Sequence, residues 1–218
     1  MLTRLGESTR DIGPIEEGLA LLEKVLAVGR TYERENLLGS GWKRMTLTLS
    51  ALQGRQVEAR AALDKAALHY RGADDTARKS GDIKRFYAAK NWLDAEVRGA
   101  LLGEQPPQLA DARIQDVRDA LQLAIAKDPD FWSVVGQTEL DILVSLVRGR
   151  LDQDGPRFIA TLCELKVRVP STRMWDSVWN QARFVLEPCL SRKDQSEAVL
   201  QQVSALLATL ERLQTPST

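Results

Sequence analysis

The side chains best suited to covalent chemistry are one histidine, His69, and two cysteines, Cys163 and Cys189. A cysteine peptidase needs a thiolate with a histidine within hydrogen-bond reach. His69 lies inside a helical segment, AALHYR, and neither cysteine lies in a glycine-flanked loop. One histidine and two scattered cysteines are also too few for a typical zinc site. We therefore expect no catalytic residue, no metal site and no cofactor, and we interpret both cysteines as reduced core residues.

Two glycine-containing motifs share only part of the pattern of a ligand-binding loop. The segment DQDGP (Asp152 to Pro156) places two acidic residues before a glycine, but Glu164 follows Asp152 by 12 positions where a calcium loop needs 11. The glycines of GSGWKRM are two apart, whereas those of a Walker motif are five apart. We interpret DQDGP as a polar turn that caps the next helix, and we expect no phosphate-binding loop.

Lysine and asparagine recur at helical spacing in two places. Asparagine can bind a peptide main chain, and lysine can bind its carboxylates. These residues are the candidate partner-binding groove: Asn36, Ser40, Lys43, Arg44, Lys90, Asn91 and Asp94. A solvated helix face would have the same composition. If the groove hypothesis is right, glutamate at positions 43 and 90 should abolish partner capture without unfolding the chain.

Five tryptophans are the largest apolar side chains of the sequence. Core filling is the expected role of most of them, because each tryptophan buries a large area. Trp175 and Trp179 are one helical turn apart, so that pair could alternatively form an exposed docking patch.

Charge and composition narrow the class of protein. The 218 residues include 30 basic and 30 acidic side chains, a balance that argues against a broad polyphosphate-binding surface. The first residues lack the apolar core of a signal peptide, and the longest aliphatic stretch, DILVSLV, is far shorter than the roughly 20 residues of a membrane span. We expect a cytoplasmic protein that does not associate with membranes.

Helical periodicity extends over almost the whole chain, and alternating strand patterns are nearly absent. About nine helices are expected, with GEQPPQ as the clearest loop and shorter helices over 157–167 and 172–186. Short connections favour antiparallel neighbours. The predicted fold is all-α, a right-handed stack of antiparallel helical hairpins of the divergent tetratricopeptide-like α-solenoid type.

Two glycines inside one predicted helix support this stack. Each glycine in a helix interior lowers stability by roughly 0.5–1 kcal/mol relative to alanine, so its presence needs a structural explanation. Leu38, Gly39 and Trp42 have the Leu-Gly-x-x-aromatic spacing of a tetratricopeptide first helix. Gly39 would allow a neighbouring helix to approach, and Trp42 would fill the space one turn later. Gly41 has no such consensus role, and it could serve the same contact or simply be tolerated.

Second-helix patterns follow, but their spacing is irregular. Ala59, Leu63 and Ala66 have the small-large-small pattern, which recurs from Val117 and ends at Pro129. The repeats are longer than the usual 34 residues. We expect a hairpin array over 1–154, and over 155–218 helices that continue or cap it.

The segments LLGSGWKR, AALHYRGADDTAR, FYAAKNWLDAE and DPDFWSVVGQTELDILVSLVRGRL, in this order, resemble the tetratricopeptide-like region of bacterial multidomain proteins. Such regions accompany CHAT (caspase-like) peptidase domains. The similarity covers residues 32–151 and implies partner recognition or regulation. No peptidase domain lies within these residues, so the effector would be a separate chain or another part of a longer protein.

Three classes of function follow. The leading hypothesis is a cytoplasmic scaffold that binds a protein or peptide and recruits or regulates an effector. The alternative is an RNA- or DNA-binding α-solenoid that uses the basic segment 78–90, although nucleic acid is the weaker hypothesis. The third is an enzyme with an unrecognised site. The last helix, with its apolar face, could cover the final repeat or form a homodimer seam.

Overall fold

The computed structural model describes residues 1–103, 107 and 109–214. These residues form ten α-helices and one 3₁₀ helix, joined by turns and loops. No strand occurs among them, which confirms the all-α prediction. Part of the predicted loop GEQPPQ, residues 104–106 and 108, lies outside the described residues. The chain divides into two compact units, Met1–Gly99 and Ala100–Thr218.

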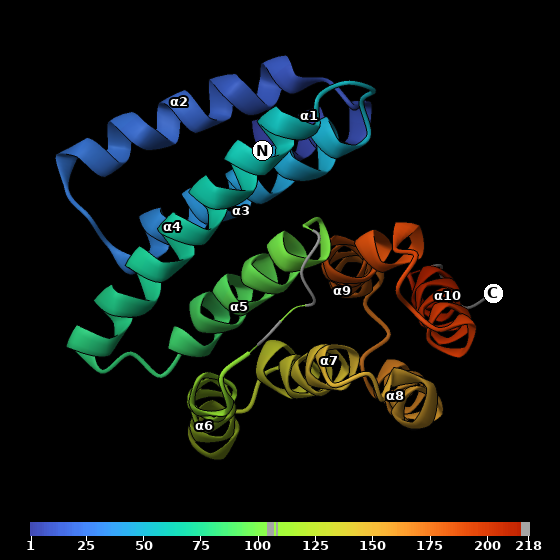
Figure 1. Ribbon diagram of the computed structural model, residues 1–218. Coiled ribbons are helices and arrows are strands. Elements are labelled where there is room, and N and C mark those ends of the chain that lie inside the picture. The colour runs from blue at the N-terminus through green and yellow to red at the C-terminus, as the bar shows by residue number, and fades with distance from the viewer. Residues whose placement is uncertain (104–106, 108, 215–218) are drawn as a thin grey trace. The chain divides into compact units, whose positions relative to one another are not determined.

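Unit 1 is built from the first five helices, drawn from blue to green in Figure 1. They are α1 (Leu2–Thr9), α2 (Ile12–Val28), α3 (Tyr32–Ser50), α4 (Gln56–Ser80) and α5 (Arg85–Leu101), whose last two residues belong to unit 2. Helix α3 packs against α1, α2 and α4. Its N-cap is Thr31, whose hydroxyl accepts a hydrogen bond from the Arg34 backbone N–H. Helix α4 ends at Gly81, which has the left-handed backbone conformation typical of a helix C-terminus.

The two glycines of α3 serve two different contacts. A Cβ atom at Gly39 would lie 2.8 Å from the ring of Tyr70 on α4, and a Cβ at Gly41 would lie 2.7 Å from Leu19 on α2. Residues two apart in a helix point about 200° away from each other, so each glycine meets a different neighbour. Trp42 is partly buried against the apolar core of unit 1, with the Lys65 amine 4.0 Å above its ring. The predicted close approach at Gly39 is therefore confirmed, and Gly41 has the same role towards α2.

Helix α5 follows α3 in a parallel direction. Lys43 contacts Asn91, and Ser50 accepts a hydrogen bond from Arg98, so residue numbers increase together along both helices. Contacts with α4 have the opposite order, because Asp74 pairs with Arg85 whereas Arg60 reaches the carbonyl of Gly99. Within unit 1, α3 and α5 thus run parallel to each other and antiparallel to α4.

Unit 2 contains five further α-helices and the 3₁₀ helix. They are α6 (Asp111–Lys127), α7 (Phe131–Val147), α8 (Leu151–Arg168), α9 (Thr172–Leu186), η1 (Glu187–Ser191) and α10 (Glu197–Leu213). Helices α7, α8, α10 and α9 contact one another in a closed cycle, and α6 packs on α7. Trp175, which is 0% exposed, lies in the core of this unit and donates a hydrogen bond to the Val169 carbonyl.

The structure differs from the sequence predictions at three points. An additional short helix, α1, precedes α2, and its Gly6 packs on Ile15. The segment DQDGP is the beginning of α8 and not a turn before it; its aspartates favour this position because carboxylates stabilise helix N-termini. The boundary expected between residues 154 and 155 falls inside α8, whereas the two compact units divide between Gly99 and Ala100.

The apolar face of α10 is used within unit 2. Val203 and Leu206 are both 0% exposed, and the helix packs against α8 and α9. The face that could have formed a dimer seam therefore covers the core of its own unit.

Candidate partner-binding site

Residues from three helices of unit 1 converge between α3 and α5. The Lys43 amine, from α3, lies 3.4 Å from Oδ1 of Asn91 on α5, and Asn91 donates to the Tyr87 carbonyl at 2.8 Å. The phenol of Tyr70 reaches this region from α4, after its ring has passed over Gly39. We call this region the α3–α5 junction, defined by Asn36, Ser40, Lys43, Arg44, Tyr70, Lys90, Asn91 and Asp94.

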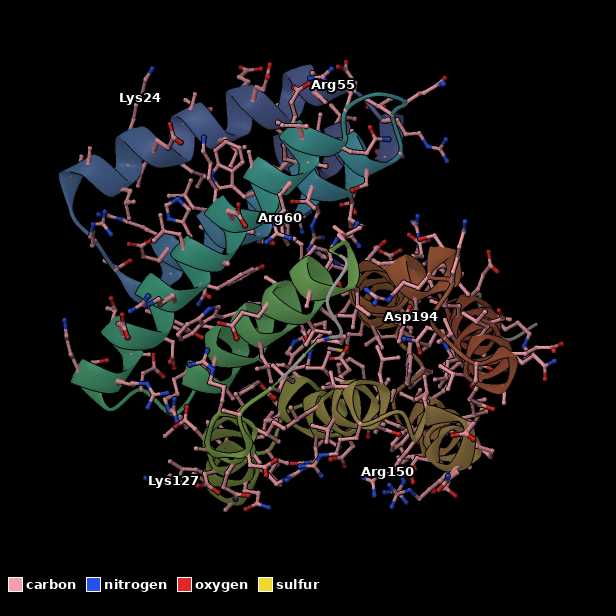
Figure 2. The ribbon with its side chains drawn as sticks, in the orientation of Figure 1. Lys24, Arg55, Arg60, Lys127, Arg150 and Asp194 are labelled. Carbon is pink, nitrogen blue, oxygen red and sulfur yellow. The ribbon has the colours of Figure 1, made fainter. Side chains whose placement is uncertain are left out.

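The amine of Lys43 has a perturbed pKa. Burial, and to a lesser extent the nearby positive charges of Arg44 and Lys90, lower the pKa of Lys43 from 10.5 to about 8. The carboxylates of Asp94 and Glu7 act in the opposite direction but more weakly. This amine therefore titrates closer to neutral pH than the ordinary lysine value of 10.5. Lys24, by comparison, is exposed and extends away from α2 in Figure 2.

Lys90 and Asp94 form a buried ion pair on α5. Their side chains are 5% and 2% exposed, and the amine lies 2.8 Å from the carboxylate. Glutamate at position 90 would place a second carboxylate beside Asp94 in a buried site, and such an unpaired charge typically costs several kcal/mol. We therefore expect glutamate at position 90 to destabilise the fold, in contrast to the expectation from the sequence, and we choose Lys43 as the position at which to test binding.

The other α3 residues of the predicted set lie on the same side of the junction. Arg44 forms an ion pair with Glu7 of α1 at 3.1 Å, and it donates a hydrogen bond to the Ser40 hydroxyl at 2.9 Å. Asn36 is 9% exposed and lies beside the Tyr32 phenol. Lys43 and Arg44 are thus brought close to residues of α5, Ser40 binds Arg44, and Asn36 lies further along α3. Asn36, Lys90, Asn91 and Asp94 are buried, whereas the predicted groove was open.

Two polar atoms of the junction are buried without a hydrogen-bond partner, the Tyr70 hydroxyl and Oδ1 of Asn36. Burial raises the pKa of Tyr70 well above 10, so its hydroxyl remains a protonated donor at any physiological pH. Ser40 lies near this phenol, but without the geometry of a hydrogen bond. Buried polar groups in folded proteins usually form hydrogen bonds, so the lack of a partner for these two atoms needs an explanation.

Sequence reasoning did not include Tyr70 or Glu7 in the site. One feature of the sequence pointed towards Tyr70. Gly39 was expected to allow close approach of a neighbouring helix, and Tyr70 is the residue that makes this approach. Glu7 lies on the short helix α1, which was not predicted.

Three of the five cations in the basic segment 78–90 are in ion pairs with two aspartates. Arg78 and Arg85 both pair with Asp74 at 2.9 Å, and Lys90 pairs with Asp94. Of the five cations, Lys79 and Lys84 remain as exposed positive charges. This is a small basic surface for a nucleic-acid phosphate backbone.

His69, Cys163 and Cys189 each have a local environment of their own. His69 is hydrogen-bonded through Nδ1 to the buried carboxylate of Glu35 at 2.7 Å, and Arg30 binds the same carboxylate. Both cysteines belong to unit 2; burial raises the pKa of the Cys189 thiol to about 12, whereas Cys163 is exposed, contrary to the prediction of a buried residue. Among the described residues, no three His, Cys, Asp or Glu side chains gather as a metal site would require.

None of the helices in the described part of the chain has the length and apolarity that crossing a membrane would require. Comparisons with protein-family models, with curated proteins and with solved structures each find no significant match. Function must therefore be argued from the α3–α5 junction.

Proposed function

We propose that this chain is a partner-binding helical module without catalysis of its own, and that it recruits or regulates an effector protein such as a caspase-like peptidase. The observation that carries this proposal is the convergence of Lys43 and Asn91, which are 48 residues apart in the sequence and 3.4 Å apart in space. Amines and amides in such a cluster are suited to binding carboxylates and main-chain amides.

The arrangement of α3, α4 and α5 supports a stack of hairpins in unit 1. Successive first helices of such a stack run parallel and carry the residues that contact a partner. Helices α3 and α5 have this relation, and they supply all seven predicted binding residues. We extend the stack hypothesis no further than unit 1, because α7 to α10 contact one another in a closed cycle.

A peptide selection tests this proposal directly. A displayed library of random peptides would be selected on the wild-type chain, and selected peptides would be measured by calorimetry on Lys43→Met and Lys24→Met. We expect binding about tenfold weaker or more on Lys43→Met, because a hydrogen bond to a charged group is worth roughly 1.5–3 kcal/mol.

Lys24→Met is the matched control, since it removes the same charge from an exposed position. It should leave the affinity of the selected peptides unchanged. Peptides that bind all three proteins equally would contradict a role of the junction in partner binding.

A further inference from the structure

Helix α2 buries one side and exposes an apolar stripe on another. Ile15 and Leu19 are at most 3% exposed, and the helix packs through them on α1 and α3. Leu21, Val25 and Val28 are 49%, 44% and 84% exposed, and their spacing of four and three residues places them along one face. We call these three residues the α2 stripe. No other helix in the described part of the chain exposes more than two large apolar side chains, so the stripe needs an explanation.

Two opposite charges line one edge of the α2 stripe. Glu17 and Lys24 are seven residues apart, and helical geometry places both of them on the same edge, next to Leu21 and Val28. Both charged side chains are exposed, and neither has an ion-pair partner among the described residues. Figure 2 shows Lys24 extending away from its helix. This edge therefore carries a negative charge and, nearly two turns later, a positive charge, both available to a second molecule.

The order of these charges is complementary to a second copy of the same helix in the antiparallel direction. A twofold axis perpendicular to two antiparallel helices brings the same edge of both helices together. Lys24 then faces the partner's Glu17, Glu17 faces the partner's Lys24, and Leu21 lies near the axis. In a parallel pair this edge would instead meet the opposite edge of the second helix, where Gly18 and Leu22 are uncharged. The charges therefore favour the antiparallel arrangement.

We infer that the α2 stripe is a homodimer interface, in which α2 pairs antiparallel with α2 of a second copy of this chain. Burial of the stripe supplies the free energy of association, and the two pairs of Glu17 with Lys24 determine the orientation. Helix α2 has 17 residues and is about 25 Å long. One helix pair of this length buries less than the roughly 1,000 Å² of a stable interface, so the dimer is weak. The inference is independent of the α3–α5 junction, which does not include Lys24.

Analytical ultracentrifugation of the full chain, from about 10 µM to about 1 mM, tests for this dimer. The weight-average mass should rise with concentration from 24.3 kDa towards twice that value. Leu21→Glu places two like charges near the axis and should weaken association about tenfold or more. Leu68→Glu is the matched control, because Leu68 is an apolar residue of α4 that is 65% exposed and lies outside the α2 stripe. It should associate as wild type, and amide spectra would confirm that both variants are folded.

Exchange of the two edge charges tests the antiparallel orientation. Glu17→Lys and Lys24→Glu each place like charges opposite one another twice in the dimer, so each variant alone should associate about threefold to tenfold more weakly. An equimolar mixture of the two variants should recover the association of the wild type, because every lysine of one chain then faces a glutamate of the other. A chain that carries both substitutions should recover it as well.

Three results would overturn the inference. A mass that stays at 24.3 kDa over the whole concentration range would show that no dimer forms. Association that Leu21→Glu leaves unchanged, or that Leu68→Glu weakens equally, would assign self-association to another surface. A mixture of Glu17→Lys and Lys24→Glu chains that associates no better than either variant alone would exclude the antiparallel pairing of α2.

Discussion

Gly39 is a position at which one missing side chain determines how two helices pack. Alanine there would place its Cβ 2.8 Å from the fully buried ring of Tyr70. We expect Gly39→Ala to lower the free energy of unfolding by roughly 1–3 kcal/mol, because overpacking outweighs the better helix propensity of alanine. Urea denaturation measures this change.

The matched control is Gly13→Ala in α2. Its nearest neighbouring atom is the Asp11 carboxylate oxygen at 3.4 Å, and the position is exposed. This variant should be neutral or more stable by up to about 1 kcal/mol. Equal effects of the two substitutions would show that Gly39 makes no special contact.

The Tyr70 hydroxyl is expected to reduce stability, because it is buried without a partner. We expect Tyr70→Phe to raise the free energy of unfolding by about 1 kcal/mol, since it removes an unpaired polar group. Such a cost is typical of a group retained for function. Thermal and urea denaturation of the variant measure it.

Tyr32→Phe provides the comparison, because the Tyr32 hydroxyl donates a hydrogen bond to the Lys84 carbonyl at 2.6 Å. It should lower stability by about 1 kcal/mol. A loss of stability in both variants would mean that the Tyr70 hydroxyl is paired in solution.

At the scale of elements, Asp74 joins the end of α4 to the beginning of α5. Its carboxylate is 1% exposed and accepts hydrogen bonds from Arg78 and Arg85, both at 2.9 Å. Asp74→Asn removes the charge that compensates two cations, so we expect a loss of roughly 2–4 kcal/mol in a urea titration. Asp75→Asn, at the exposed neighbouring position, should change stability by no more than about 0.5 kcal/mol.

Most helices could be predicted from the sequence because their apolar stripes and end signals agree. Gly81 ends α4 as expected, and Asp130 caps α7 with a full capping box. Helix α1 could not be predicted, since eight residues with few apolar side chains give little periodicity. The beginning of α8 was misplaced because Gly155 and Pro156 are typical of turns, yet both lie inside the helix.

Helical spacing predicted that the candidate residues of each helix share a face, but it did not predict their burial. Lys90 and Asp94, four residues apart, form an ion pair on α5. Whether two such groups face each other depends on how α5 packs on α3, and that is a tertiary property which one sequence does not specify. The same holds for Trp175, which packing places in the core and not on a docking surface.

At the scale of the whole molecule, the two compact units each have their own core. Leu63 of unit 1 and Leu162 of unit 2 are at most 1% exposed, so alanine at either position should cost roughly 2–5 kcal/mol. We expect Leu63→Ala to accelerate amide hydrogen exchange mainly within residues 1–99, and Leu162→Ala mainly within 109–214. Equal acceleration along the entire chain by either variant would show a single cooperative unit.

The α3–α5 junction requires that the Lys43 amine lies between α3 and α5 beside the cations of Arg44 and Lys90. Selective ¹³C labelling of lysine allows its amine to be titrated by NMR. The structure gives a pKa of about 8 for Lys43, against the ordinary value of 10.5. A titration near pH 8 in the chain alone is the expected result, whereas a midpoint close to 10.5 would place this amine in water and contradict the α3–α5 junction.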